Sequence, residues 1–251
     1  MNDAIIDRHA EYNIVNGIEQ LNLIKNIIAL RKRVWPDFIR LADDIIFKIY
    51  KLYPDFQVSL LDKNNELIAI ANSLPIIGNK SLIDLSNDGV SWVINTVLDE
   101  NYDVNLANIL CAISITVSDK YRNRGISKIL LQYLNQIKHS KKYTSLIVPV
   151  RPSLKCLYPL ISIDKYIKWK NKAGLIFDPW LRTHISVGAN ILNVCHRSAF
   201  ITATISQWEQ WTGLCFPDDG SYIIKNALVP IEIDFMNNQG TYIEPNVWVS
   251  Y

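Results

Sequence analysis

The residues best suited to chemistry form a short basic turn. It reads Arg-Asn-Arg-Gly-Ile-Ser over residues 122–127, and Lys120 adds a positive charge just before it. Gly125 permits a backbone conformation closed to other residues, so that successive amides of the turn can point at one ligand. Such a turn at the start of a helix binds anions, because the unpaired amides and the helix dipole both favour negative charge. The turn therefore predicts a site for a phosphate-bearing ligand.

Two regular elements must position this turn. Residues 109–117 form an apolar run typical of a buried strand. After Gly125 we expect an amphipathic helix, whose buried face carries Ile126, Ile129, Leu130, Tyr133, Leu134 and Ile137. Residues 144–150 resemble another short buried strand. A strand, helix and strand with this crossover length predict parallel neighbours.

The remaining pattern mixes helices and strands without an internal repeat or a flexible linker. The expected helices are 18–33, Asp37 to the residue before Pro54, 92–98, Asp164 to Gly174, 179–192, and a short helix from a Ser206 cap to Gly213. The polar tetrad 62–65 between β-rich runs predicts a hairpin turn, and 198–205 reads as a strand. This order predicts one mixed α/β domain over 17–251 after an N-terminal extension over 1–16.

Length and composition limit the class of protein. The 251 residues are 49% hydrophobic and 20% charged, and the net charge of +2 does not favour nucleic-acid binding. The longest apolar run, Ile109 to Val117, is too short to cross a bilayer, and the first residues lack a signal-peptide pattern. The scattered cysteines, without a CxxC pair, suit free thiols in a reducing compartment better than a metal site. We therefore expect a cytoplasmic protein without a metal, membrane or nucleic-acid partner.

The turn resembles the pyrophosphate-binding motif of the GNAT acyltransferase superfamily, which is written Q/R-x-x-G-x-G/A. Arg122 takes the first position, Gly125 the glycine and Ser127 the last small position. The resemblance implies a single GNAT fold of the α/β class, in which helices flank a mixed central sheet with splayed parallel strands. It also implies a coenzyme A thioester, acetyl-CoA or malonyl-CoA, as co-substrate. The implied coenzyme contacts are Ile115, Val117, Arg122, Asn123, Arg124, Gly125, Ile126 and Ser127.

Beyond this core unit over 109–150, the extension 151–251 is longer than a minimal GNAT domain needs. It resembles the GNAT-like decarboxylase and S-acyltransferase domains of polyketide synthase loading modules in VRPSLKCLYPL, FDPWLRTHISVGA, QWEQWTG and YIEPNVWV. That resemblance implies catalytic roles for His184, Arg197 and Ser153, where decarboxylating members carry Thr, and it implies an acyl pocket lined by Trp35. If the resemblance is set aside, the sequence predicts a packing role for His184, a turn position for Ser153 and an ion pair with a surface acid for Arg197.

The function implied first is transfer of a short acyl group to the phosphopantetheine thiol of an acyl carrier protein in polyketide-type biosynthesis. The acyl group would be acetyl, taken from acetyl-CoA or formed from malonyl by decarboxylation. A histidine suits either step near neutral pH. Three alternatives stay open: an N-acetyltransferase acting on an amine, a malonyl thioester decarboxylase without transfer, and a non-catalytic CoA-binding or interaction module.

Overall fold

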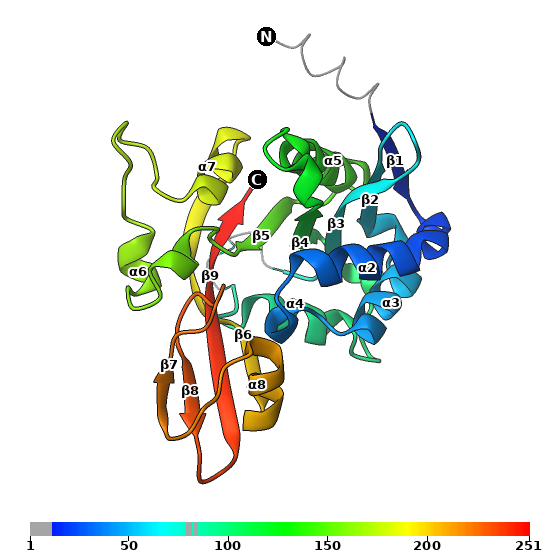
Figure 1. Ribbon diagram of the computed structural model, residues 1–251. Helices are drawn as coiled ribbons and strands as arrows, with labels where there is room; N and C mark the ends of the chain where they lie inside the picture. Colours follow the sequence, from blue (N-terminus) through cyan, green and yellow to red (C-terminus); the bar gives the residue numbers. More distant parts are fainter. Residues whose placement is uncertain (1–11, 79–81, 83–84) are drawn as a thin grey trace. The chain divides into compact units, whose positions relative to one another are not determined.

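The computed structural model describes residues 12–78, 82 and 85–251 (Figure 1). The contacts within the chain divide it into two compact units. Unit 1 comprises the described part of Met1–Trp35 together with Arg40–Ile77 and Val104–Leu146. Unit 2 comprises Pro36–Ile39, the described part of Gly78–Asp103, and Ile147–Tyr251. The candidate coenzyme turn lies in unit 1, and the candidate catalytic residues lie in unit 2.

Unit 1 contains antiparallel strands that pair in chain order: β1 (Asn13–Asn16), β2 (Gln57–Leu61), β3 (Leu67–Ile76) and β4 (Ile109–Val117). The predicted hairpin turn at 62–65 is confirmed between β2 and β3. There Asn65 has a left-handed φ of 60°, and the Asp62 carboxylate accepts the amides of Asn64 and Glu66 at 2.9 Å each. β1 lies inside the predicted extension 1–16, so part of that segment belongs to the sheet.

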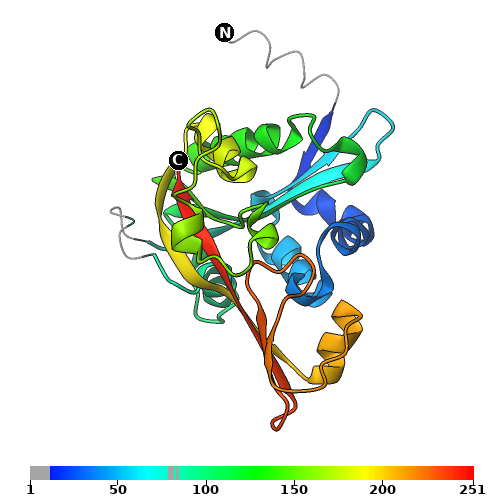
Figure 2. The ribbon, with the colours of Figure 1, turned by 60° about the vertical axis from the view of Figure 1, so that its left-hand side comes forward.

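Helices cover both faces of this sheet (Figure 2). α2 (Ile24–Val34) and α3 (Asp43–Leu52) bury Ile27, Leu30, Ile46 and Tyr50 against Ile70 of β3. α5 (Ile126–Ser140), the predicted amphipathic helix, covers the other face, and its buried residues include Ile126, Ile129, Leu130, Leu134 and Ile137. The short 3-10 helices of the unit are η2 (Ile18–Leu23), η4 (Pro54–Phe56), η5 (Val104–Leu106) and η6 (Asp119–Tyr121).

The predicted helix from Asp37 begins instead at Asp43, and this part of the prediction is wrong. Residues Asp37–Ile39 form the 3-10 helix η3 in unit 2. Phe38 is buried there, with its ring centroid 5.9 Å from that of Trp208 and 5.3 Å from that of Tyr242. Burial of this aromatic ring outweighs the local helical pattern, because packing overrides propensity in short segments.

Unit 2 is organised around β9 (Gln239–Ser250). Its other strands are β5 (Ser145–Val150), which enters the unit after Leu146, β6 (Asn190–Ala203), β7 (Gly220–Tyr222) and β8 (Ile231–Asp234). β5, β6 and β8 each pair antiparallel with β9, and β7 pairs with β8. β5 confirms the strand predicted at 144–150. Its parallel pairing with 109–117 stays a prediction, because those strands lie largely in different units.

The helices of unit 2 are α4 (Gly89–Val97), the 3-10 helix η7 (Lys155–Leu157), α6 (Ile163–Tyr166), α7 (Pro179–Ser186) and α8 (Ile205–Thr212). α8 ends at Gly213 as predicted, but Thr204 caps its start instead of Ser206. α7 is shorter than the predicted helix 179–192. It ends before Gly188, which has a φ of 97°, and β6 begins at Asn190.

The helix predicted from Asp164 to Gly174 is wrong beyond its first turn. The Asn171 side chain accepts the amides of Ala173 at 2.9 Å and Leu175 at 3.0 Å, which turns the chain back. Trp169 then stacks edge-on against Tyr158, with ring centroids 4.9 Å apart.

Each unit therefore combines β-sheet with flanking helices, and the predicted α/β class is confirmed. The single domain over 17–251 stays a prediction. Within the described residues, no helix has both the length and the apolar character that a membrane span requires.

Candidate active site

The basic turn adopts the backbone conformation that its glycine suggested. After η6, Asn123 has a φ of 62° and Gly125 a φ of 79°, so both lie in the left-handed region. Asparagine and glycine are the residues that tolerate this region best. α5 begins directly afterwards at Ile126, with Gly125 as its N-cap.

Successive amides of the turn form no hydrogen bond of good geometry to an acceptor among the described residues. They belong to Asn123, Arg124, Gly125, Ile126 and Ser127. The amides on either side are engaged, since that of Arg122 donates to the Asp119 carbonyl at 3.3 Å and that of Lys128 to the Gly125 carbonyl at 3.0 Å. A run of free amides at the start of a helix is an anion-binding arrangement.

Exposed positive charge flanks these amides. The Arg122 guanidinium lies 2.8 Å from the Asp119 carboxylate, but the side chains are 53% and 69% exposed. Such exposed ion pairs contribute little stability, so Arg122 can exchange Asp119 for a phosphate. Arg124 lies 5.1 Å above the Tyr121 ring. The Tyr121 hydroxyl donates to Asp62 at 2.7 Å, which lowers the pKa of that carboxyl and fastens the turn to the β2–β3 hairpin.

The strand that leads into the turn carries the other predicted coenzyme contacts. Ile115 and Val117 of β4 lie opposite Ala71 and Ala69 of β3, and both are half-buried. Their side chains point to the opposite face from Ser114 and Thr116, because side chains alternate along a strand.

Trp35, at the end of α2, contacts this same strand from the α2 side of the sheet. Its indole Nε1 donates to Thr116 Oγ1 at 2.8 Å. Earlier in β4 the pairing skips Ile113, since Ser114 pairs with Asn72 and Ala112 with Ser73. This β-bulge bends β4 just before the residues predicted to meet the coenzyme, and bulges are frequent beside functional sites.

In unit 2, His184 is completely buried on α7. Its Nδ1 lies 2.7 Å from the Tyr251 hydroxyl, and the Trp180 ring packs at 4.4 Å between centroids. Its Nε2 is buried and has no partner in the described chain. Burial lowers the pKa of His184 to about 3, so the imidazole is neutral at pH 7. Nε2 can accept a proton in the tautomer in which Nδ1–H donates to Tyr251, whereas Nε2 carries the hydrogen if Tyr251 donates to Nδ1.

We predict that His184 makes the stability of the protein depend on pH below neutrality. The pKa of His184 in the folded state, about 3, lies below the ordinary histidine pKa of 6.5, so only the unfolded chain takes up this proton as the pH falls through 6.5. The stabilisation is complete above pH 6.5 and is lost progressively toward pH 3. Between pH 7 and pH 5, the proton that His184 takes up on unfolding lowers the free energy of unfolding by about 2 kcal/mol.

Urea unfolding of the wild type and of His184→Gln at both pH values measures this loss. The variant should lose less stability than the wild type by that amount, and His139→Gln, which removes an exposed histidine, controls for the substitution. Identical losses in the wild type and His184→Gln would show that His184 is not held neutral by the fold.

Neither Ser153 nor Arg197 forms a hydrogen bond, ion pair or ring contact with His184. Ser153 Oγ lies 3.5 Å from Asp178, the residue that caps α7 through the amides of Trp180 and Leu181. Arg197 is 58% exposed and pairs with Asp88 at 3.4 Å, which is the surface pairing considered from the sequence. The catalytic roles of His184, Ser153 and Arg197 stay predictions.

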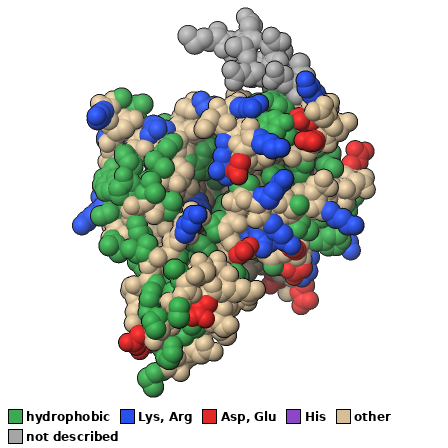
Figure 3. Space-filling model, viewed as in Figure 1, with side chains coloured by type: hydrophobic (Ala, Val, Ile, Leu, Met, Phe, Trp, Pro, Cys, Tyr) green, Lys and Arg blue, Asp and Glu red, His purple; other side chains and the backbone are tan. Residues whose placement is uncertain are grey.

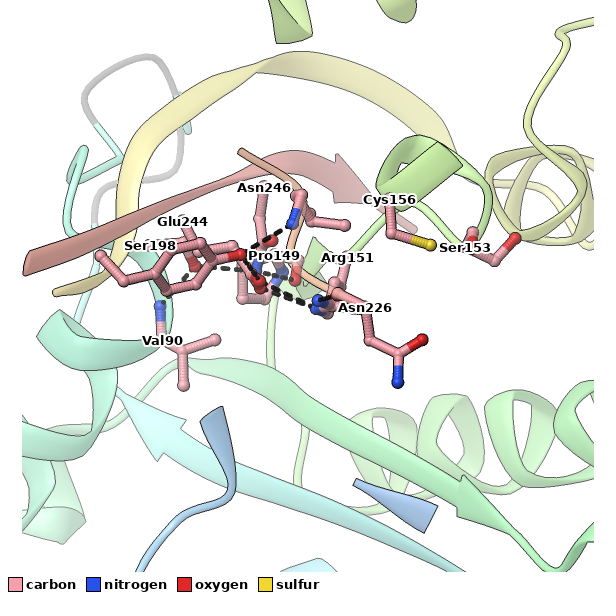
Figure 4. Close-up of polar contacts among 11 residues, drawn as sticks. Val90, Pro149, Arg151, Ser153, Cys156, Ser198, Asn226, Glu244 and Asn246 are labelled. Carbon is pink, nitrogen blue, oxygen red and sulfur yellow. Dashed lines mark hydrogen bonds and ion pairs between the residues drawn. The ribbon is translucent and has the colours of Figure 1, made fainter. Parts of the chain in front are cut away.

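A buried polar network in unit 2 was not predicted (Figure 4). Arg151 Nε donates to both carboxylate oxygens of Glu244, at 2.8 and 3.0 Å, and its Nη2 donates to the Asn226 carbonyl at 2.6 Å. Glu244 also accepts the Tyr242 hydroxyl at 2.6 Å. The only sequence signal was the occurrence of Arg151 and Glu244 within two of the resembling blocks.

The fold resembles that of solved GNAT-type proteins. The loading GNATL domain of CurA from Lyngbya majuscula matches with a TM-score of 0.63 and 18% identity, over 96% of both chains. The GphF GNAT-like decarboxylase in complex with isobutyryl-CoA matches with a TM-score of 0.62 and 14% identity, over 95% of this chain and 98% of the other. No family model matches the sequence. These similarities define the fold class as GNAT.

Sequence similarity then gives the family. The chain is 30% identical over 248 residues to arginine N-acetyltransferase avaD from Aspergillus versicolor, over 86% of this chain and 84% of the relative. The chain belongs to the same family of GNAT acyltransferases as that enzyme, so the superfamily and the enzyme class predicted from the sequence are confirmed.

Proposed function

We propose that the protein transfers an acyl group from acyl-CoA to an amine group of arginine. The observation that carries the proposal is the run of unpaired amides over residues 123–127, in front of the α5 N-terminus. The acceptor class rests on similarity to the arginine N-acetyltransferase avaD. The amine acceptor was an alternative in the sequence analysis, and this relative makes it the preferred one.

The turn would hold the diphosphate of the coenzyme through charge-assisted hydrogen bonds from these amides. Arg122 can leave Asp119 to add its charge, since both side chains are exposed. The main chain of Ile115 and Val117 would bind the pantetheine arm, and Trp35 would bound the acyl group from the α2 side of β4. These roles use only residues of unit 1.

The reaction requires a neutral amine that attacks the thioester carbonyl. A carbon–nitrogen bond forms, the carbon–sulfur bond breaks, and the amine proton passes through a base to the departing thiolate of the coenzyme. His184 stays the candidate base because it is neutral at pH 7 and its Nε2 is unpaired, but its low pKa makes it a weak base.

A carrier-protein thiol, with or without malonyl decarboxylation, is the second candidate for the acceptor. One observation favours it: exposed apolar side chains gather on the part of unit 2 around α6 (Figure 3). In the segments before and after α6, Leu157, Leu160 and Leu175 are 66%, 75% and 57% exposed. Exposed apolar clusters often mark surfaces that a protein partner covers.

Incubation with radiolabelled acetyl-CoA or malonyl-CoA, and with L-arginine or a holo-acyl carrier protein as acceptor, tests the proposal. We expect label on arginine from acetyl-CoA, and a loss of rate of at least about 100-fold in His184→Gln if His184 is the base. Label on the carrier protein alone would favour the second candidate. If the protein binds CoA but labels neither acceptor, the non-catalytic CoA-binding module would be the remaining alternative.

A further inference from the structure

We propose that Arg31 binds a carboxylate of the substrate through its unpaired Nε–Nη2 edge. Arg31 lies on α2 and is 3% exposed. Its Nη1 donates to Asn72 Oδ1 at 3.2 Å and to Ser114 Oγ at 3.3 Å. Its Nε is buried without an acceptor in the described chain. Both side-chain hydrogen bonds of Arg31 to the described residues come from Nη1, which leaves Nη2 without one. Through this edge a guanidinium can bind a carboxylate in a bidentate pair, with two parallel hydrogen bonds.

The surrounding side chains hold the guanidinium in place without neutralising it. The Asn72 amide nitrogen donates to the Tyr50 hydroxyl at 2.9 Å and to Gln57 Oε1 at 3.0 Å, which turns Asn72 Oδ1 toward Arg31. Tyr50, Gln57 and Asn72 are all buried, so this orientation is fixed by packing as well as by hydrogen bonds.

No carboxylate forms an ion pair with Arg31 among the residues that the structure describes. Asp43, which acts on it electrostatically, is engaged by Lys32 at 2.8 Å and by Arg40 at 3.2 Å. Burial lowers the pKa of Arg31 to about 10, so the guanidinium remains charged at pH 7. A buried charge is costly unless it is paired, and buried arginines normally have an anionic partner. A ligand carboxylate would supply that partner.

The position of Arg31 connects it with the proposed reaction. Ser114 follows the bulge at Ile113 and is half-buried, so this member of the polar cluster is partly open to solvent. Arg31 and Trp35 lie one helical turn apart on α2, and they contact Ser114 and Thr116 on the same face of the strand. This step of the inference rests on the proposed function, because that function assigns the pantetheine arm, and with it the bound substrate, to β4.

The carboxylate can come from either substrate. An amino acid such as arginine carries one beside the amine that reacts, and a malonyl thioester carries one on the acyl group. A purely structural role is the competing explanation, in which Arg31 only ties α2 to β3 and β4. A structural role would not distinguish ligands with a carboxylate from matched ligands without one.

The first measurement is the NMR signal of the Arg31 Nε–Hε group in the full chain, assigned by its absence from Arg31→Lys. We expect the signal to shift on addition of L-arginine and not of L-argininamide if the acceptor supplies the carboxylate. A shift with malonyl-CoA and not with acetyl-CoA would identify the donor. A signal that moves with none of the carboxylate ligands overturns the proposal, and this result needs no catalytic turnover.

The second measurement compares kcat/KM for paired substrates in the wild type, Arg31→Met and Arg33→Met. Arg33 lies exposed on the same helix, so its variant removes the same charge away from the cluster. The wild type and Arg33→Met should prefer the carboxylate member by roughly 10–100-fold, and Arg31→Met should lose that preference. Unchanged preference in Arg31→Met refutes the role of Arg31. Absence of acetyl-CoA binding by the wild type would instead refute the proposed function.

Discussion

Gly125→Ala is expected to raise the dissociation constant for acetyl-CoA about tenfold or more, and Gly125→Val further. Gly125 has a φ of 79°, a conformation that costs an L-residue with a Cβ roughly 1–2 kcal/mol. The chain can avoid this cost only by rotating the peptide units around Gly125. That rotation would turn the amides of 123–127 away from a common ligand, and each lost charge-assisted hydrogen bond weakens binding further.

Isothermal titration calorimetry measures the dissociation constant for acetyl-CoA in the wild type and in Gly125→Ala, and Gly213→Ala is the matched control. Gly213 ends α8 with a φ of 69°, and a Cβ there would meet nothing within 4 Å. The control therefore has the same kind of backbone strain and similar loss of stability without touching the turn. Equal affinities for acetyl-CoA in Gly125→Ala and Gly213→Ala would contradict the role assigned to the turn.

Arg151→Met is expected to destabilise the protein by about 3–5 kcal/mol, the largest stability effect that we predict. Removal of the guanidinium leaves the Glu244 carboxylate, which is 1% exposed, with the Tyr242 hydroxyl as its one side-chain donor among the residues that the structure describes. The Asn226 carbonyl also loses its donor. An uncompensated buried charge is far more costly than the loss of an exposed ion pair.

Urea unfolding at pH 7 measures this effect, and two further variants separate its causes. Arg151→Met with Glu244→Gln removes both charges and should recover much of the lost stability. Lys141→Met breaks the exposed pair with Asp55, whose side chains are 40% and 60% exposed, and should cost less than about 1 kcal/mol. If Arg151→Met cost no more than Lys141→Met, the buried ion pair would not be the source of stability.

The local parts of the candidate site could be predicted from the sequence. The apolar run before Gly125, the glycine turn and the amphipathic helix depend on neighbours within a few residues, so their pattern determines them. The same holds for the hairpin turn at 62–65. Prediction failed where distant packing decides the local structure, as when Phe38 is buried against Trp208 and the helix starts only at Asp43.

The polar clusters could not be predicted because their members lie far apart in the sequence. Arg31 is separated by 41 residues from Asn72 and by 83 from Ser114, and Arg151 by 93 from Glu244. Nothing in the surrounding residues of Arg31 indicates that its side chain is buried, since it lies between Leu30 and the exposed Lys32. Only the fold reveals a buried guanidinium with an unpaired edge.

Amide NMR during a titration with coenzyme A, compared with pantetheine, tests the central claim most directly. Pantetheine lacks the diphosphate and keeps the arm assigned to β4. We predict that the amide signals of residues 123–127 shift with coenzyme A and stay in place with pantetheine. Tight binding of coenzyme A that leaves those signals unchanged would contradict the account, because the diphosphate would then be held elsewhere.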